Sequence, residues 1–415
     1  MSAGRTSHTI SACRICGHTD LAPVIDLGDQ PLANALVEPG SDRAEARHPL
    51  AVVRCRGCSL VQLTVTVAPD EMFSDYPYFS STSTSFVEAM GKLARRTARH
   101  ERLGPDSLVV EIASNDGYLL SHYRDLGVPV LGVDPAANVA AVAEQRGVPT
   151  VVDFFGTRVA GRLRDEGRSA DVIHANNVIA HVPELGDVLS GIAQLLAPGG
   201  VALIETPHLV EMIRRLEFDT IYHEHVFYHS LTALGSALAR HGLVVADVER
   251  IPTHGGSLRL HVRHQGAEVS PSVTDLLSLE QQLGVETDEY YASFAGQVEA
   301  ARTRTMAALR GLRDEGTTIA GYGAAAKATV LCNYFGIDAD VVEYVVDRSP
   351  AKQGRLIPGV RIPILAPEEL ERRRPDATVL FAWNLRDEIL EQQAAYVAGG
   401  GAFVVPMPDW ELILT

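Results

Sequence analysis

The chain has 415 residues, 46% of them hydrophobic, which is enough to bury the cores of about two to four domains. Its formal net charge of −16 argues against a nucleic-acid-binding protein and against binding to an anionic membrane surface. No apolar run is long enough to cross a bilayer and the N-terminus lacks the apolar core of a signal peptide, so we expect a cytoplasmic protein.

Four of the five cysteines form two pairs, CRIC and CRGC, in the first 60 residues. Paired thiolates two residues apart can hold one tetrahedral ion, and two such pairs favour a structural zinc over the alternative of a redox dithiol. We expect Arg54 and Arg56 to temper the negative charge of this site, and Cys332 to be a buried apolar side chain. The predicted zinc ligands are Cys13, Cys16, Cys55 and Cys58.

The segment FSDYPYFSSTSTSF at residues 73–86 is rich in aromatic and hydroxyl side chains and predicts an irregular loop before a helix. It is either a packed linker or a substrate lid that uses Tyr76, Tyr78 and nearby serines. The sequence alone leaves both interpretations open.

Strands and helical stretches alternate over residues 107–207, which is typical of an α/β unit with a parallel sheet. The first turn, EIASNDG, lacks the G-x-G-x-x-G of nicotinamide folds and resembles motif I of class I S-adenosylmethionine (SAM) methyltransferases. Ligands of such sheets bind at the carboxyl ends of the strands. The predicted SAM-binding residues are Glu111, Ala113, Asn115, Gly117, Asp134, Asp153, Phe154 and Asn176.

Among these residues, Asp134 ends the second strand and is expected to contact the ribose hydroxyls, the alternative being a strand-end cap. Asp153 and Phe154 are expected to meet the adenine. The stretch GLVVADVERIPTHGGSLRLHVRH then predicts two strands joined by a turn. Gly255 and Gly256 in that turn either let a ligand approach the backbone or simply close a hairpin.

The last part of the chain begins with a helical pattern over residues 273–315 and continues as a second α/β unit. Its turn at Gly321 and Gly323 opens a helix whose N-terminal amides could take a phosphate, and Lys327 lies one helical turn further on. A glycine turn of this kind also suits NAD.

The whole chain resembles the TDP-deoxysugar C-methyltransferases, with the sugar C-3′-methyltransferase type of tetronitrose biosynthesis as the nearest match. The resemblance is carried by CRIC and CRGC, EIASNDG, NNVIAHVP, TIYHEHVFYHS, HGGSLR, GYGAAAK and DRSPAKQGRLIPG. Ala325 departs from the proline often found in the glycine turn.

The resemblance implies three parts: a zinc-binding domain (1–75), a Rossmann-like class I SAM domain (76–265) and a second Rossmann-like α/β domain that helps bind the nucleotide sugar (266–415). It also implies a TDP-3-amino-2,3,6-trideoxy-4-keto hexose as substrate, methylated at C-3′. The residues expected to bind this substrate are Tyr76, Tyr78, Asn177, Tyr322, Gly323, Lys327 and Lys352.

The segment TIYHEHVFYHS at residues 220–230 is where the resemblance places catalysis. Carbon methylation beside a ketone needs a base, and we interpret His225 as that base. Tyr222 either orients the ring or is itself the base, and Glu224 either holds the imidazole or contacts the sugar's amino group. His181 is expected to hydrogen-bond the C-4′ oxygen.

Two further histidines of this segment, and the function as a whole, leave room for other interpretations. His223 and His229 are each interpreted as packed or solvated side chains rather than as catalytic groups. The alternative functions are a NAD-dependent nucleotide-sugar oxidoreductase, suggested by the glycine turn, and a non-catalytic zinc-ribbon scaffold protein.

Overall fold

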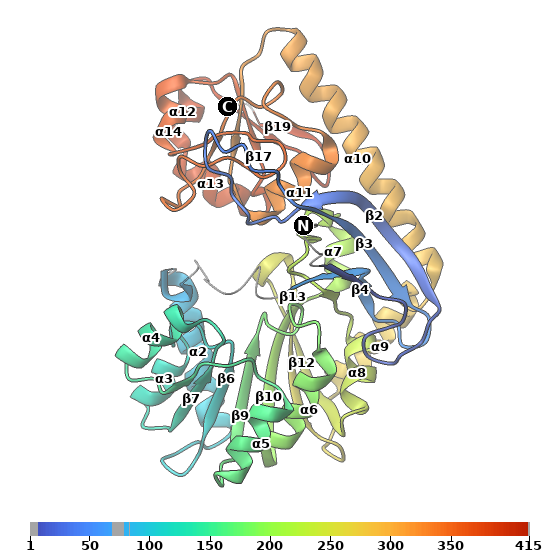
Figure 1. The fold of residues 1–415 in the computed structure, drawn as a ribbon, viewed down its shortest axis with the longest axis vertical. Helices are drawn as coiled ribbons and strands as arrows, with labels where there is room; N and C mark the ends of the chain where they lie inside the picture. The colour runs from blue at the N-terminus through green and yellow to red at the C-terminus, as the bar shows by residue number, and fades with distance from the viewer. Residues whose placement is uncertain (1–6, 69–78, 83, 414–415) are drawn as a thin grey trace.

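The computed structural model describes residues 7–68, 79–82 and 84–413, and its sheets follow one another in the predicted order (Figure 1). An antiparallel N-terminal sheet is followed by a largely parallel central sheet and a second, largely parallel C-terminal sheet. The predicted fold class is therefore confirmed. Among the described residues, none of the helices has both the length and the apolar character that crossing a bilayer requires.

The N-terminal sheet has the strand order β11-β4-β3-β2, and β1 and β5 form a separate two-stranded sheet. In β3 the side chains of Leu50 and Val52 are buried, with less buried residues between them, as expected for a strand that covers a core with one face. The strands are β1 (Ser7–Thr9), β2 (Leu21–Pro31), β3 (Arg47–Cys55), β4 (Val61–Leu63) and β5 (Val65–Val67).

The strand β11 (Phe227–Tyr228) belongs to the N-terminal sheet although it lies in the middle of the chain. It pairs antiparallel with β4, with Phe227 opposite Gln62. The domain boundaries at residues 75/76 and 265/266 stay a prediction, because the histidine-rich segment that contains β11 completes a sheet of the first part.

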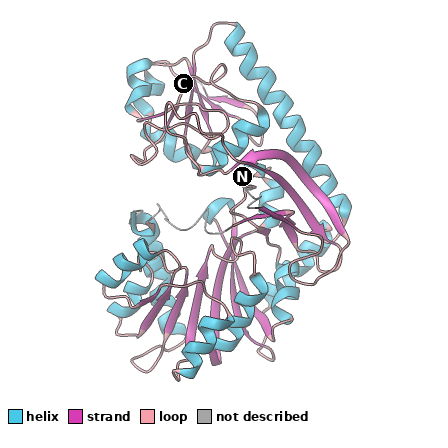
Figure 2. Ribbon diagram, in the orientation of Figure 1, coloured by secondary structure: helices cyan, strands magenta, loops and turns pink. Residues whose placement is uncertain are grey.

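The central sheet has the order β12-β13-β10-β9-β6-β7-β8, in which β8, β7, β6, β9 and β10 run parallel. Helices lie on both faces of this sheet (Figure 2), and its inner strands β6 and β7 are buried along almost their whole length. The strands are β6 (Val109–Ile112), β7 (Val130–Val133), β8 (Thr150–Val151), β9 (Ala170–Asn176), β10 (Leu196–Pro207), β12 (Leu243–Ile251) and β13 (Ser257–His264). The helices are η1 (Ser80–Thr82), α2 (Thr84–His100), α3 (Leu120–Asp125), α4 (Ala137–Gln145), α5 (Thr157–Asp165), α6 (Leu185–Leu195), α7 (Leu209–Arg214), η2 (Phe218–Thr220), α8 (Leu231–Ala239) and η3 (Thr253–Gly255).

The predicted hairpin is present as β12 and β13, which pair antiparallel. Its turn needs both glycines, because φ is 82° at Gly255 and 122° at Gly256. A Cβ at Gly255 would lie 2.2 Å from an oxygen of Glu217, and one at Gly256 would lie 2.8 Å from Cγ of Glu211. The groups that approach this backbone closely are therefore two side chains of the protein itself.

The C-terminal sheet has the order β16-β15-β14-β17-β18-β19, with only β19 antiparallel. The helical pattern that precedes it is confirmed as α9 and α10. The helices are α9 (Pro271–Leu283), α10 (Asp288–Asp314), α11 (Ala326–Phe335), α12 (Glu368–Arg373), η4 (Trp383–Leu385), α13 (Arg386–Gln392) and α14 (Ala394–Ala398). The strands are β14 (Ile319–Tyr322), β15 (Val345–Val346), β16 (Ile364–Leu365), β17 (Ala377–Leu380), β18 (Ala402–Val405) and β19 (Glu411–Ile413).

The long helix α10 runs beside β2 of the N-terminal sheet and leads into the C-terminal domain (Figure 1). One apolar core includes Leu50 of the N-terminal sheet, Phe294 of α10 and Leu331 of α11. A second core includes the buried Cys55 together with strands of the central sheet. The three parts are thus joined by shared apolar cores rather than by linkers alone.

Candidate functional site

The four paired cysteines converge on one point. Their Sγ atoms all lie within 4.8 Å of one another, with Cys13 and Cys58 3.6 Å apart and Cys16 and Cys55 3.4 Å apart. Zn–S bonds of about 2.3 Å around a tetrahedral ion imply sulfur–sulfur separations of about 3.8 Å. The four sulfurs therefore fit one zinc ion with a closed coordination shell, which suits a structural rather than a catalytic metal.

Tight turns set this cysteine geometry. In the first turn Gly17 donates its amide to the Cys13 carbonyl and has a φ of 72°, a conformation that suits glycine. In the second turn the Gly57 amide lies 3.3 Å from Cys55 Sγ and donates to it, which stabilises negative charge on that sulfur.

The two arginines beside the second cysteine pair have a different partner from the one that the sequence suggests. Arg54 lies 2.5 Å from the carboxylate of Asp288, and Arg56 also pairs with it. Because Asp288 is the first residue of α10, these contacts fasten the cysteine turn to the helix that leads into the C-terminal domain.

The predicted SAM site lies at the carboxyl ends of β6, β7 and β9. In the turn after β6, three residues have positive φ: Ala113 (53°), Asn115 (48°) and Gly117 (76°). Two of these are not glycine, and such conformations are concentrated at binding sites. This geometry explains why glycines are expected at these two positions, and it makes Ala113 and Asn115 strained residues at the predicted site.

Several buried polar groups at this edge have no hydrogen bond of normal geometry among the described residues, although Tyr118 and Asn176 lie close to the Glu111 carboxylate. They include both carboxylate oxygens of Glu111, both amide atoms of Asn176 and the side-chain oxygen of Asn177. Burial raises the pKa of Glu111 well above its usual range. Buried polar groups are normally satisfied, so this set fits a polar ligand such as SAM.

Asp134 holds the turn from the neighbouring strand. Its two carboxylate oxygens accept the backbone amides of Asn115 (2.8 Å) and Ala136 (2.9 Å), and its pKa is raised by burial. Each carboxylate oxygen has a second lone pair, so a cap of this kind leaves room for a ribose hydroxyl. The two interpretations of Asp134 are thus compatible.

The two residues expected to meet the adenine lie at the open side of the same edge. Phe154 is 51% exposed, so its ring face is accessible to a planar base. Asp153 forms an ion pair with Arg158 at 2.6 Å, which lowers the pKa of the carboxyl group.

The 3₁₀ turn η1 is fastened to this edge. The Ser80 amide donates to the Asn115 side chain at 2.9 Å, and the Ser81 hydroxyl donates to the buried carboxylate of Asp116 at 2.5 Å. Arg146 donates to both Ser81 and the Asp116 carbonyl. Ser80 and Ser81 therefore contact the SAM turn, whereas Tyr76 and Tyr78 lie outside the described residues.

The histidine-rich segment is anchored on both sides by buried apolar residues. Ile221 lies in the core shared with the C-terminal domain, and Val226 lies in the core of the central domain. The Leu63 amide also donates to the Val226 carbonyl at 2.9 Å. These anchors hold residues 222–225 between the C-terminal domain and the central domain.

His225 has a defined hydrogen-bond pattern. Its Nδ1 lies 2.7 Å from the Thr220 carbonyl, which can only accept, so Nδ1 carries the proton. In the neutral ring Nε2 is then the basic nitrogen, and the Tyr222 hydroxyl lies 2.8 Å from it. The His181 ring packs edge-on against His225, with ring centroids 4.8 Å apart. The structure thus brings three of the predicted catalytic side chains together.

Glu224 points to a different partner. Its Oε1 accepts a hydrogen bond from Asn34 Nδ2 at 2.7 Å, and burial raises its pKa. Asn34 lies in the loop after β2, and nothing in the sequence around it indicates a functional residue. Its position emerges only because the N-terminal sheet folds against the central domain.

His223 and His229 are buried and serve packing. His223 donates from Nε2 to the His48 carbonyl at 3.3 Å, and burial lowers its pKa to about 4. His229 lies 2.9 Å from the Thr206 hydroxyl, and burial lowers its pKa to about 3. Both rings are therefore neutral near pH 7, in keeping with the interpretation from the sequence.

In the C-terminal domain the predicted glycine turn follows β14. A Cβ at Gly321 would lie 2.5 Å from the Phe381 ring, and one at Gly323, where φ is 92°, would lie 2.7 Å from Ala382 Cβ. Close packing against Phe381 and Ala382, which follow β17, thus accounts for both glycines. Lys352 Nζ donates to the Ala324 carbonyl at 2.9 Å and so braces the same turn.

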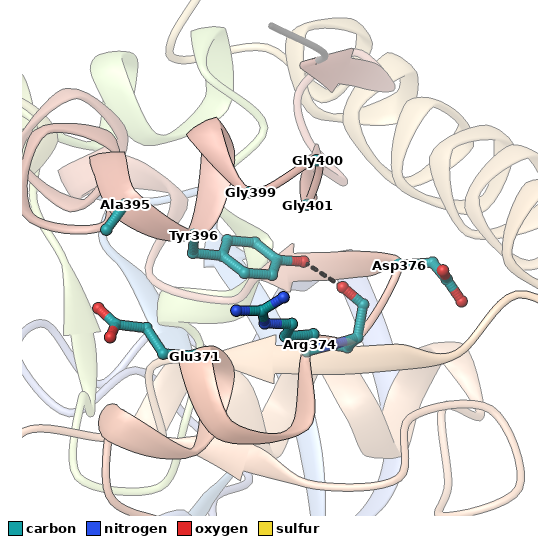
Figure 3. A pocket seen from close by; sticks show the side chains of 9 residues that line it. Glu371, Arg374, Asp376, Ala395, Tyr396, Gly399, Gly400 and Gly401 are labelled. Carbon is teal, nitrogen blue, oxygen red and sulfur yellow. Dashed lines mark hydrogen bonds between the residues drawn. The ribbon is translucent and has the colours of Figure 1, made fainter.

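A surface pocket of the C-terminal domain lies at the opposite end of that sheet. Figure 3 shows it between Glu371, Arg374 and the Gly399–Gly401 turn, at the residues that precede β17 and β18. The Tyr396 hydroxyl that faces it already donates to the Pro375 carbonyl at 2.9 Å. Ligands of parallel sheets bind at the carboxyl ends of the strands, so this pocket is not part of the site.

Comparison with known proteins decides the family. Three family models match consecutive parts of the chain: a putative zinc binding domain at residues 13–73, a methyltransferase domain at residues 86–248 and a C-methyltransferase C-terminal domain at residues 252–408. Over 407 residues the chain is 37% identical to C-methyltransferase NovU of Streptomyces niveus, covering 97% of each chain. The chain belongs to this family of C-methyltransferases.

Two further similarities cover only part of the chain. A ubiquinone biosynthesis O-methyltransferase of Rhodopseudomonas palustris (strain BisB18) is 30% identical over 100 residues, which is 24% of this chain and 39% of that one. The crystal structure of magnesium protoporphyrin IX methyltransferase from Synechocystis PCC 6803 with bound SAM covers 43% of this chain and 79% of its own. Its sequence identity is 14% and its TM-score 0.34.

The C-methyltransferase assignment identifies SAM and a structural zinc as the cofactors. The methyltransferase model covers the turn with the unpartnered polar groups, and the zinc-binding model covers all four converging cysteines. The alternatives of a NAD-dependent oxidoreductase and a non-catalytic scaffold are therefore set aside.

Replacing Asp134 with alanine is expected to weaken SAM binding to this C-methyltransferase by about 1–3 kcal/mol, because a buried hydrogen-bond acceptor for the ribose is lost. Asp134→Asn is the matched control, since its side-chain oxygen still serves one of the two backbone amides. Titration calorimetry with SAM measures the difference. Equal affinities for wild type and Asp134→Ala would rule out a ribose contact.

Proposed function

We propose that the protein uses SAM to methylate C-3′ of a TDP-3-amino-2,3,6-trideoxy-4-keto hexose, through an enolate formed by removal of the C-3′ proton. The substrate follows from the resemblance of the chain to the TDP-deoxysugar C-methyltransferases. The observation that carries the mechanism is the hydrogen-bond pattern of His225, in which Nδ1 donates to the Thr220 carbonyl and Nε2 is left basic next to Tyr222.

The C-4′ ketone makes the neighbouring C–H acidic enough for a positioned base. His225 Nε2 takes the C-3′ proton, the C–H electron pair forms the C-3′=C-4′ bond of the enolate, and negative charge develops on the C-4′ oxygen. General-base catalysis of this kind typically contributes about 10²–10⁴-fold. Bound SAM supplies an electrophilic methyl group for C-3′.

The residues around His225 take supporting roles in this proposal. His181, whose ring packs against His225, hydrogen-bonds the C-4′ oxygen as charge develops there. Tyr222 orients the imidazole through its hydroxyl and is the alternative base. Both ring nitrogens of His225 already have partners, so we assign Glu224 to the sugar's amino group rather than to the imidazole.

The remaining substrate contacts are proposed from the resemblance. Asn177 lies in the left-handed region after β9, with a φ of 56°, next to the SAM edge. Tyr322, Gly323 and Lys352 form or brace the glycine turn that we propose faces the nucleotide. The proposed contacts of Tyr76 and Tyr78 lie outside the described residues.

The test is to incubate the purified protein with SAM labelled with ¹³C in the methyl group and the TDP-4-keto sugar, and to locate the label by NMR. The ketone acidifies C-5′ as well as C-3′, so the position of the label decides the regiochemistry. The expected product carries the label on C-3′. The matched sugar reduced to an alcohol at C-4′ should receive none. Label on C-5′, oxygen or nitrogen would contradict the proposal.

A further inference from the structure

A buried carboxylate connects the C-terminal domain to the turn that precedes His225. Asp219 lies in η2 and is fully buried. Its Oδ2 accepts a hydrogen bond from the indole Nε1 of Trp383 at 2.7 Å, and Lys327 Nζ lies 3.7 Å from its Oδ1. Trp383 and Lys327 both belong to the C-terminal domain, so this carboxylate is held from outside the central domain.

Lys327 is directed at this carboxylate rather than into open solvent. Its side chain is 14% exposed, and its Nζ lies 4.5 Å from the centre of the Trp383 ring, within the range of a cation–π contact. Asp219 and Trp383 thus both stabilise the ammonium group. The sequence suggests instead that this lysine binds a phosphate.

The apolar neighbours of Asp219 come from the same domain. The Phe218 ring stacks on Phe335 of α11 with centroids 5.2 Å apart, and it lies 5.5 Å from the Tyr334 ring. The turn η2 therefore packs on α11 through both Phe218 and Asp219.

This turn supplies the group that orients the proposed base. Thr220 follows Asp219 directly, and its carbonyl accepts the Nδ1 proton of His225 at 2.7 Å. The Thr220 hydroxyl donates to the Glu217 carbonyl at 2.7 Å, which closes the turn. A change in how Asp219 is held would thus move the Nδ1 acceptor and alter which nitrogen of His225 is basic.

We propose that Asp219 is a positioning residue for His225, and that Lys327 serves to neutralise and hold Asp219 rather than to bind the diphosphate of the substrate. The proposal rests on the proposed function, because it takes His225 to be the base. It makes the C-terminal domain part of the catalytic apparatus as well as a surface for the nucleotide.

Two ionisable side chains, Glu217 and Lys327, act on the charge of Asp219. Glu217 is buried on the same turn, and burial raises its pKa to about 7. Burial also raises the pKa of Asp219, while Lys327 opposes that shift. Removing Lys327 alone would leave a buried carboxylate without its cation, which is far more disruptive than removing the whole pair.

The decisive experiment compares Lys327→Met, Asp219→Asn and the double variant in steady-state methylation. We expect Lys327→Met to lower kcat by roughly tenfold or more with little change in KM for the nucleotide sugar. The double variant should regain at least about fivefold of that loss, because coupled partners are not additive. If Lys327 bound a phosphate of the substrate, Lys327→Met would instead raise KM, and adding Asp219→Asn would restore no activity. That outcome would overturn the proposal.

Lys352→Met is the comparison for a lysine assigned to the nucleotide side of the site, and it should raise KM instead of lowering kcat. Trp383→Phe is the mildest probe of Asp219, because it removes only the indole N–H donor and keeps an aromatic ring over Lys327. It should lower kcat in the same manner as Lys327→Met, to a smaller extent.

An NMR readout separates this proposal from the role of His225 itself. In protein labelled with ¹⁵N-histidine, the Nδ1–H signal of His225 is assigned by its loss in His225→Gln. Asp219→Asn and Trp383→Phe should shift or weaken that signal while SAM still binds. An unchanged signal in both variants would refute the positioning role. If His225 is not the base, Asp219→Asn and Trp383→Phe should still change the Nδ1–H signal of His225 but should leave the rate of methylation unchanged.

Discussion

Replacing His225 with alanine is expected to lower the rate of methyl transfer by about 10²–10⁴-fold and to leave SAM affinity unchanged. The reason is geometric: Nδ1 donates to the Thr220 carbonyl, so Nε2, which lies 2.8 Å from the Tyr222 hydroxyl, is the basic nitrogen that we propose accepts the proton. Single-turnover methylation with labelled SAM measures the loss, and calorimetry measures SAM binding.

Tyr222→Phe is the necessary comparison for this prediction. It removes only the hydroxyl that lies 2.8 Å from His225 Nε2 and keeps the aromatic ring that packs against the imidazole. We expect a smaller decrease than for His225→Ala. Near-normal methylation by His225→Ala combined with an inactive Tyr222→Phe would identify a tyrosinate as the base and reverse our assignment.

The second large effect is expected from Cys13→Ser, which should abolish zinc binding and destabilise the N-terminal domain. Structural zinc contributes several kcal/mol of folding free energy, which corresponds to roughly 10 °C or more in the midpoint of thermal unfolding. The effect should extend beyond this domain, because the cysteine turn is joined to α10 through Arg54, Arg56 and Asp288. Elemental analysis and thermal unfolding measure the two consequences.

Cys332→Ala is the matched control for the loss of zinc. Cys332 is fully buried in the C-terminal core and lies outside the group of four converging sulfurs. Its replacement should leave about one zinc per chain. Wild-type protein that is purified without chelators and holds no zinc would contradict the metal assignment.

The features that could be predicted from the sequence are those encoded by short spacings. The two cysteine pairs each need one tight turn, so their spacing alone indicates a tetrahedral site. The motif EIASNDG ends an apolar strand and leads into a helix, and the positive φ of Ala113 and Asn115 shows that its turn has the conformation usually given to glycine. The alternation of strands and helices likewise predicts two α/β units, each with a parallel sheet, and both sheets are largely parallel.

Contacts between distant parts of the chain could not be predicted. Glu224 and Asn34 are 190 positions apart, and neither residue lies in a pattern that refers to the other. The strand β11 has two residues, too few for any periodicity, and its pairing with β4 follows from how the domains pack.

Lys327 shows how a local motif can suggest an incomplete role. A glycine turn followed by a lysine is typical of phosphate binding, yet the glycines are accounted for by packing against Phe381 and Ala382. The lysine lies beside Asp219, which comes from another domain. The sequence contains both residues but no signal that they meet.

The most direct test of the central claim is solvent-deuterium exchange at C-3′ of the TDP-4-keto sugar, measured beside methyl transfer for wild type, His225→Ala and Tyr222→Phe. Proton removal by His225 predicts that wild-type protein incorporates deuterium at C-3′ in D₂O and that His225→Ala lowers both exchange and methylation by about 10²–10⁴-fold. Wild-type rates of exchange and methylation in His225→Ala would contradict the account, and unchanged rates in Tyr222→Phe as well would transfer the role to His181.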